Sequence, residues 1–319
     1  MKINSIIKSI LLFAVVVSSG LQAKPVYIAT TAIVEHPALD AVRDGIKAVL
    51  NENGYVGEKL KFTYESAQGQ PVIAAQIARK IVGNQPDVIV AIATPSAQAA
   101  VSASKNIPIV FSAVTDPVAA KLVSSLIQPG KNVTGLSDKV NVKQHLALLK
   151  EILPNLKSVG IPYNPGEANS VSMMADMKEA AAEMGIKIVE SAAPKSSDVM
   201  IATKQLIGKV DAIYCPIDNT IISAFESVVK VGIDAQVPVF AADTGSVERG
   251  AVAAVGYNYF DLGRQTGEIV LRILKGEKPG DIDVKMAQGT SLFVNPKMAA
   301  RMGITIPKEV IDRATKVIK

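Results

Sequence analysis

Several residue types that carry chemistry are scarce in this chain of 319 residues. It has no tryptophan, two histidines and one cysteine, and it lacks the GxGxxG, P-loop and GxSxG motifs of dinucleotide, nucleotide and serine-hydrolase sites. A lone cysteine cannot form an internal disulfide, so we expect Cys215, in the strand-like run AIYCPI, to be a small core residue. His36 and His145 have no partner at metal-ligand spacing, and we expect His145 to pack or to lie on a helix surface. The sequence therefore predicts no catalytic residue, no metal site and no cofactor.

The charge balance gives no sign of a nucleic-acid partner. The chain has 34 basic and 29 acidic residues, and without Lys2 and Lys8 the net charge is about +3, with no basic stripe interleaved with aromatic residues. Hydrophobic residues make up 49% of the chain, so a chain of this length can fill the cores of two domains.

The first 23 residues have the pattern of a secretory signal. Lys2 and Lys8 precede the apolar run of residues 10–17, and small residues lead to a predicted cleavage after Ala23, although Leu21 is larger than the usual residue at its position. The alternative is a membrane anchor, but the apolar run is shorter than the roughly 20 residues of a spanning helix. No cysteine lies near the cleavage site. We therefore expect a periplasmic protein without a lipid anchor.

A βαβ unit in residues 87–117 organises the first half of the chain. The run VIVAIA at residues 88–93 is apolar without alternation, which predicts a central parallel strand covered on both faces. A helix over residues 97–104 and a second strand at residues 108–111 follow. Both strands end in small polar residues, which places two polar clusters at the carboxyl edge of one sheet, where open α/β sheets bind ligands.

The rest of the chain alternates in the same way. Strands are predicted at residues 25–31, 60–65, 88–93 and 108–111, each followed by a helix, and the alternation restarts with the helix 142–153. The second series has strands at residues 158–163, 186–190, 211–215 and 238–241 and helices at 173–184, 199–207 and 221–233. The chain continues beyond what the second lobe needs, with strands predicted at residues 252–257, 283–286 and 290–294 and helices at 261–274 and 296–302. We therefore predict an α/β fold of two doubly wound, Rossmann-like lobes, between which the chain crosses more than once.

Six loops at strand ends, three in each half, supply the candidate ligand contacts. Any single polar residue there is more often a helix cap, and His36 is as well suited to capping as to ligand contact, but six facing loops favour a small zwitterion or polyol. The candidates are Glu35, His36, Thr94, Pro95, Ser96, Ser112, Ala113, Val114, Thr115 and Asp116 in the first half, and Glu167, Ala168, Asn169, Asp218, Asn219, Asp243 and Thr244 in the second.

The motifs HPALDAVRDGI, ATPSAQAA, FSAVTDPVAA, NVTGLSD, YNPGEANS, PIDN and YNYFDLGRQTGEIVLRILKGEKP together resemble the tryptophan/tyrosine-binding branch of ABC transporter substrate-binding proteins. The resemblance covers the chain from about Pro25 to its end. It implies a type I periplasmic binding fold, with three crossovers near Ser137, Asn258 and Met286. The implied lobes are residues 24–137 plus 258–285 and residues 138–257 plus 286–319.

The resemblance also implies a function. A monomer would close its lobes on an amino acid and deliver it to a membrane permease driven by an ATPase. Thr94, Ser96, Ser112 and Thr115 would hold the α-carboxylate, and Asp243, with Asp218 and Glu167 as alternatives, would hold the ammonium. Tyr163, Phe111 and Tyr257 could line an aromatic pocket or belong to the core.

Two other functions stay open at this point. A sensor that docks a membrane receptor would have the same binding site, and the sequence does not separate it from a transport component. An enzyme on a two-lobe scaffold is disfavoured, because no nucleophile and base occur together.

Overall fold

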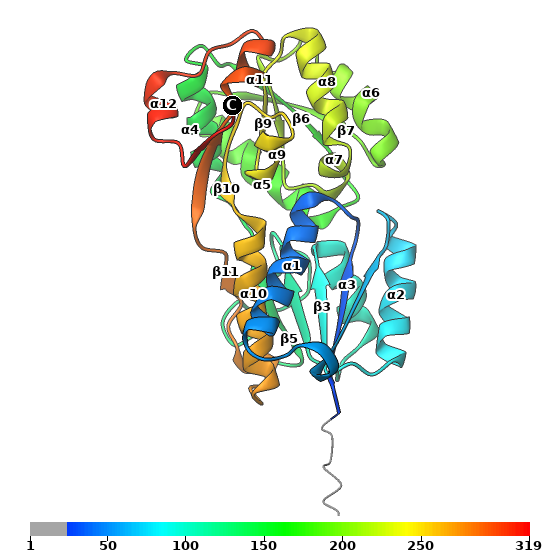
Figure 1. Ribbon diagram of the computed structural model, residues 1–319. Coiled ribbons are helices and arrows are strands. Elements are labelled where there is room, and N and C mark those ends of the chain that lie inside the picture. Colours follow the sequence, from blue (N-terminus) through cyan, green and yellow to red (C-terminus); the bar gives the residue numbers. More distant parts are fainter. Residues whose placement is uncertain (1–23) are drawn as a thin grey trace, which may run out of the picture.

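The computed structural model describes residues 24–319, and the predicted signal segment, residues 1–23, lies outside the described residues. These residues form two α/β lobes stacked end to end, with the crossing segments along one side (Figure 1). In the part of the chain that is described, no helix combines the length and the apolar character needed to cross a membrane.

The N-terminal lobe is built on a parallel six-stranded sheet in the order β11-β5-β4-β3-β1-β2. All five residues of β3 are buried, which confirms the predicted central strand, and β2 is the predicted edge strand. The strands are β1 (Val26–Ala32), β2 (Leu60–Ser66), β3 (Val88–Ile92), β4 (Ile109–Ser112), β5 (Val133–Ser137) and β11 (Lys285–Met286). Its helices are α1 (Pro37–Glu52), α2 (Pro71–Gly83), α3 (Thr94–Ala103) and α10 (Tyr259–Leu274), with short 3₁₀ turns η1 (Gly57–Lys59) and η3 (Pro279–Asp281).

Helices α1 and α10 lie side by side on one face of this sheet (Figure 1). Glycines make the close approach possible, because a Cβ on Gly263 would lie 2.2 Å from the carbonyl oxygen of Val42, and a Cβ on Gly45 would lie 2.2 Å from that of Phe260. Helix α10 comes from the far end of the chain, so this contact ties the segment after the second crossing to the first helix.

Two features of this lobe differ from the prediction. No helix follows β4, because the turn that begins at Asp116, whose carboxylate accepts a hydrogen bond from the Ala119 N–H at 2.9 Å, ends at Lys121 with a φ of 60°. The prediction that every one of the first four strands is followed by a helix is therefore wrong at β4. Strand β5, in the NVTGLSD motif, was not predicted as a strand, and it pairs with β4 through residues 133–135.

The C-terminal lobe contains a parallel four-stranded sheet in the order β7-β6-β8-β9 and a three-stranded sheet in the order β10-β12-β13. The predicted helix over residues 221–233 is interrupted at Ala224 and forms α7 and α8. The strands are β6 (Ser158–Tyr163), β7 (Lys187–Ala192), β8 (Ala212–Cys215), β9 (Val239–Ala241), β10 (Ala253–Tyr257), β12 (Thr290–Val294) and β13 (Lys316–Val317). The helices are α4 (Val142–Ile152), α5 (Ala168–Glu183), η2 (Ser196–Asp198), α6 (Val199–Lys204), α7 (Asn219–Ser223), α8 (Phe225–Ala235), α9 (Gly245–Glu248), α11 (Pro296–Arg301) and α12 (Lys308–Asp312).

Two residues of types that are often reactive, Cys215 and His145, are buried in the core of this lobe. Cys215 is fully buried in β8, as predicted. His145 is buried on α4, and its Nδ1 lies 2.6 Å from the hydroxyl of Tyr214, whose ring it meets edge-on. His145 therefore packs in the core, which was one of its two predicted roles.

The chain passes between the lobes between β5 and α4, between β10 and α10, and between β11 and β12 (Figure 1). The predicted division into residues 24–137 plus 258–285 and 138–257 plus 286–319 stays a prediction. Strand pairing supports it, because β5 and β11 pair with each other and β10 pairs with β12. In each lobe the strand order reverses beside the first strand, at β1/β3 and at β6/β8, and ligands of doubly wound folds bind at such switch points.

Candidate functional site

The two switch points face each other across a cavity between the lobes, which we call the inter-lobe cavity. Its volume is about 20 Å³, which is room for about one water molecule, so an amino acid can enter only when the lobes separate. On one side the cleft opens into two recesses of about 700 Å³ and 550 Å³, lined from both lobes. The cavity is lined by His36, Ala38, Leu39, Ala113, Thr115, Asp138 and Tyr259 from the N-terminal side and by Asn169, Ile217, Asp218, Asn219, Ile222 and Asp243 from the C-terminal lobe.

His36 follows β1 and begins α1. Its Nδ1 accepts a hydrogen bond from the Leu39 N–H at 3.5 Å, so it caps the helix while its ring lines the cavity. Burial, and next the charge of Arg249, lower the pKa of His36 to about 4, so the ring is neutral at pH 7. The same side chain of His36 can therefore cap α1 and contact a ligand in the cavity.

The loops after β3 and β4 have strained backbone where they reach the cleft. Ala93 and Ala113 have φ values of 71° and 54°, in the left-handed region that residues with a Cβ rarely adopt. Such strain is concentrated at ligand clamps, because the surrounding structure must hold it in place. Of the two, Ala113 lines the inter-lobe cavity.

Helix α3 starts directly after Ala93 and carries two buried hydroxyls. Thr94 Oγ1 and Ser96 Oγ have no hydrogen-bond partner in the described structure, although Thr94 is 1% exposed and Ser96 is fully buried. A buried hydroxyl without a partner costs free energy, so this pair needs an explanation other than packing.

On the C-terminal side, Glu167 is the centre of a hydrogen-bond network. Its carboxylate accepts bonds from the Thr220 N–H and hydroxyl at 3.1 and 2.8 Å, from the Asn219 side chain at 2.5 Å and from the Asn169 side chain at 3.1 Å. Glu167 lines the two recesses rather than the inter-lobe cavity. Its acceptor sites are filled from within the lobe, so it holds the cleft wall together.

Asp218 and Asp243 line the cavity and also cap helices. Asp218 accepts from the Ile221 and Asn164 N–H groups at 2.9 and 2.6 Å and from the Ser170 hydroxyl, and Asp243 accepts from the Ser246 N–H and hydroxyl at 2.9 and 2.6 Å. Burial, and next the charge of Glu167, raise the pKa of Asp218 to about 7, and burial raises the pKa of Asp243. Both carboxylates therefore have backbone donors of their own.

Asp138 differs from these carboxylates. It is fully buried in the first crossover, directly after β5, and accepts hydrogen bonds from the Tyr259 hydroxyl at 2.9 Å and the Thr115 hydroxyl at 3.2 Å. Burial raises the pKa of Asp138 to about 6, so it is mostly ionised at pH 7. Within residues 24–319, no lysine, arginine or histidine forms an ion pair with it.

The structure brings together seven of the predicted site residues: His36, Ala113, Thr115, Asn169, Asp218, Asn219 and Asp243 line the inter-lobe cavity. Pro95 and Glu167 line the recesses, and Thr244 lines a smaller pocket near the crossovers. Glu35, Thr94, Ser96, Ser112, Val114, Asp116 and Ala168 do not line the inter-lobe cavity. The hydroxyl of Ser112 instead pairs with that of Thr266 at 2.6 Å, on the side of β4 that faces α10.

The aromatic candidates lie elsewhere. Phe111 is fully buried beneath Gly135, Tyr163 is half-buried, and Tyr257 donates to the Lys139 carbonyl at 3.1 Å in the crossover region. The aromatic residue of the cavity is Tyr259, which sequence reasoning missed together with Asp138, Leu39 and Ile222. Asp138 and Tyr259 could have been found from the sequence, because they lie in NVTGLSD and YNYFDLGR, which are among the motifs that carry the family resemblance.

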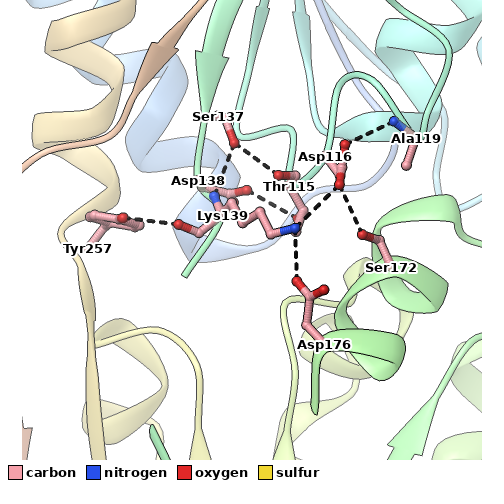
Figure 2. Close-up of polar contacts among 9 residues, drawn as sticks. All are labelled: Thr115, Asp116, Ala119, Ser137, Asp138, Lys139, Ser172, Asp176 and Tyr257. Carbon is pink, nitrogen blue, oxygen red and sulfur yellow. Dashed lines mark hydrogen bonds and ion pairs between the residues drawn. The ribbon is translucent and has the colours of Figure 1, made fainter. Parts of the chain in front are cut away.

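A polar cluster beside the cavity joins the lobes, and we call it the Lys139 latch (Asp116, Lys139, Ser172 and Asp176). The Lys139 ammonium, in the first crossover, lies 3.4 Å from the Asp116 carboxylate of the N-terminal lobe and 2.9 Å from the Asp176 carboxylate on α5 (Figure 2). The Ser172 hydroxyl, also on α5, donates to Asp116 at 3.4 Å. These contacts hold the lobes in their closed arrangement.

Comparison with known proteins places this architecture in a family. A curated tyrosine-binding protein of Clostridioides difficile is 39% identical over 269 residues, which cover 84% of this chain and 78% of that protein. A solved conserved domain protein from Vibrio cholerae is 55% identical with a TM-score of 0.91, covering 92% of this chain and all of the other. More distant ABC solute-binding proteins, 14 to 17% identical with TM-scores of 0.56 to 0.62, share the fold, which confirms the predicted type I periplasmic binding fold.

Two further structures bear on the lobe arrangement. The ABC domain from Streptococcus pneumonia in complex with L-Trp is 36% identical with a TM-score of 0.89, covering 92% of this chain and all of that one. The ligand-free, open structure of a substrate-binding protein with adhesive properties from Clostridium difficile is 40% identical, covers 92% of this chain and 99% of its own, and has a TM-score of 0.69. The lower score goes with the higher identity, which fits a different lobe arrangement in the open structure, and the small inter-lobe cavity shows that the lobes of the present structure are closed.

The relatives are named as ligand-binding or substrate-binding proteins, in agreement with the expectation that this protein is not an enzyme. The model of the ABC transporter substrate binding protein family matches residues 27–318, nearly all of the described chain. The chain belongs to the ABC transporter substrate-binding protein family.

Proposed function

We propose that this protein is the extracytoplasmic binding component of an ABC importer, which captures an aromatic or large apolar L-amino acid between its lobes and delivers it to the permease. The observation that carries the proposal is the closed inter-lobe cavity, whose wall combines polar groups with apolar side chains from both lobes. Relatives named for tyrosine binding and solved with L-Trp support the same ligand class.

The α-carboxylate belongs at the loops of the N-terminal lobe. Thr94 and Ser96 offer hydroxyls without partners in the described structure, and no side chain caps the ten-residue helix α3, so its first turn can accept an anion. Thr115 lies on the cavity wall itself. These groups neutralise a carboxylate without a cationic side chain, because the aligned amides of a helix supply partial positive charge.

The ligand side chain belongs against the apolar part of the cavity wall. Leu39 and Tyr259 contribute it from one side, and Ile217 and Ile222 from the other. A large apolar side chain that bridges these walls excludes water from both lobes at once, so its burial favours the closed arrangement.

The signal pattern and the family support a location and a delivery step. The segment 1–23 directs export and is removed, which leaves the binding protein in the periplasm beside its permease. The lobes close on the ligand, and the permease, driven by its ATPase, recognises the closed form.

The decisive experiment is native mass spectrometry of the freshly purified, signal-free protein, because a tightly held ligand is identified by its mass. Titration calorimetry with L-tryptophan, L-tyrosine, L-leucine and ribose then ranks ligands, and X-ray scattering measures compaction. We expect an aromatic amino acid to bind and to reduce the radius of gyration. Binding of ribose without any amino acid would refute the ligand class, and unchanged uptake in cells that lack the protein would refute the transport role.

A further inference from the structure

The inter-lobe cavity contains one carboxylate whose hydrogen bonds leave room for a cation. Asp218 and Asp243 each receive backbone N–H groups at helix starts, which offset their charge locally. Asp138 receives two hydroxyls, from Thr115 and Tyr259, and its own backbone N–H, and within residues 24–319 it caps no helix. A carboxylate offers about four acceptor sites, so Asp138 can accept further donors from within the cavity.

A second acceptor faces the same cavity from the opposite lobe. The side chain of Asn169 is 3% exposed, and its Oδ1 has no hydrogen-bond partner in the described structure. Its orientation is fixed, because Nδ2 donates to the Glu167 carboxylate and to the Ile217 carbonyl, both at 3.1 Å, and both partners can only accept. Asn169 Oδ1 can therefore accept a hydrogen bond from a donor in the cavity.

We infer that Asp138, together with Asn169 Oδ1, binds the ammonium group of the captured amino acid and makes the site selective for ligands with a free amine. An ammonium supplies both the positive charge that Asp138 lacks and the N–H donors that both acceptors need. The inference rests on the proposed amino-acid function. It moves the ammonium from Asp243, our first choice from the sequence, to the crossover residue that both lobes enclose.

Asp138 lies where two crossing segments meet, so a ligand bound to it can affect the arrangement of both lobes. It directly follows β5 of the N-terminal lobe, and its bond to Tyr259 reaches the start of α10, at the second crossover. An ammonium held there contacts the first crossing segment directly and is linked to the second through the hydrogen bond between Asp138 and Tyr259. Lys139, the next residue, points to Asp116 and Asp176 and does not neutralise Asp138 (Figure 2).

The test compares amino acids with analogues that lack the amine. Calorimetry is carried out with L-tryptophan and indolepropionate, and with L-tyrosine and hydroxyphenylpropionate, on the wild type and on D138N, D243N and D87N. Asp87 lies at the opposite edge of the sheet, where it accepts from the Tyr27 N–H at 2.7 Å, so D87N controls for loss of an aspartate outside the site. Melting temperatures show whether each variant folds.

We expect the wild type to prefer the amino acid over its amine-free analogue by roughly 30-fold or more, and D138N to lose this preference while it still folds. Tyr259→Phe, which removes one hydroxyl from Asp138, should weaken amino-acid binding less. Retention of the preference by D138N, or its loss in D243N instead, overturns the inference. If the wild type binds no amino acid at all, the proposed function fails, and that result is distinguishable from a failure of Asp138 alone.

Discussion

The Lys139 latch predicts that the balance between open and closed lobes depends on a single lysine. Lys139→Met keeps the aliphatic stem and removes the charge that bridges Asp116 and Asp176. The lysine side chain is 37% exposed, and the carboxylate side chains are 24% and 33% exposed, so each ion pair is partly screened and contributes about 0.2–1 kcal/mol. The two pairs together stabilise the closed form by about 0.4–2 kcal/mol, which corresponds to a roughly 2- to 30-fold change in the ratio of closed to open molecules.

Spin labels at Val72→Cys on α2 and Ile201→Cys on α6 would measure this ratio by pulsed electron resonance. Both residues are exposed, at 70% and 63%, and their helices lie on the side opposite the crossovers, where opening moves the lobes furthest (Figure 1). Lys178→Met is the matched control, because Lys178 is on the same helix as Asp176 but pairs with Glu190 within its own lobe at 2.5 Å. We expect more open molecules in K139M, and a weaker effect of salt on its ratio than in the wild type. Equal distance distributions in K139M and K178M would refute the latch.

Two further predictions concern stability. Burial lowers the pKa of His145 to about 4 in the folded state. The folded protein therefore keeps its full free energy of unfolding above the ordinary histidine pKa of 6.5 and loses about 3 kcal/mol of it as the pH falls toward 4, because the unfolded state binds the proton more readily. Denaturant unfolding of the wild type and H145Q between pH 4 and pH 7.5 should show a shallower acid loss in the variant, and parallel curves would contradict this. Gly263→Ala should destabilise by about 1–3 kcal/mol, because its Cβ would meet the Val42 carbonyl, whereas Gly83→Ala, with open space around it, should not. Equal midpoints for the two alanine variants would contradict the packing argument.

The fold was predictable where the sequence pattern is local. The unbroken apolar run of β3 and the alternation of β2 are properties of single strands, and they indicated the centre and the edge of the sheet. Strand β5 was missed because it is short and contains Gly135, which resembles loop composition. Only its neighbours explain that glycine, since a Cβ there would lie 2.2 Å from the Phe111 carbonyl.

The site was predictable as a set of loops but not as a set of side chains. Ser112 and Ala113 are adjacent, yet the hydroxyl of Ser112 faces α10 and Ala113 lines the cavity, because Ser112 ends β4 and Ala113, with a φ of 54°, begins the loop that turns toward the cleft. Asp138 looked like part of a connecting segment, since its burial exists only when the crossovers and α10 come together. Residues that depend on such long-range contacts have no local signal.

Asp138 and Lys139 are adjacent in the first crossover, but they should shift the lobe equilibrium in opposite directions. The closed arrangement buries the Asp138 carboxylate without a cation, and the rise of its pKa to about 6 corresponds to a cost of up to about 3 kcal/mol above that pH. Asn keeps the shape and an acceptor for Tyr259 or Thr115 but carries no charge. In the absence of ligand at pH 8, D138N should therefore have more closed molecules than the wild type, while K139M has fewer.

The same spin-label pair measures both variants, and the double variant separates them. If the two effects act on one equilibrium, D138N/K139M should lie between the single variants. Adding L-tryptophan should close the wild type, because the ammonium removes the cost at Asp138, but should shift D138N little beyond its ligand-free ratio. A ligand-free D138N that is as open as the wild type would mean that Asp138 is buried equally in both arrangements, and the ammonium would then have to close the lobes through the C-terminal wall at Asn169.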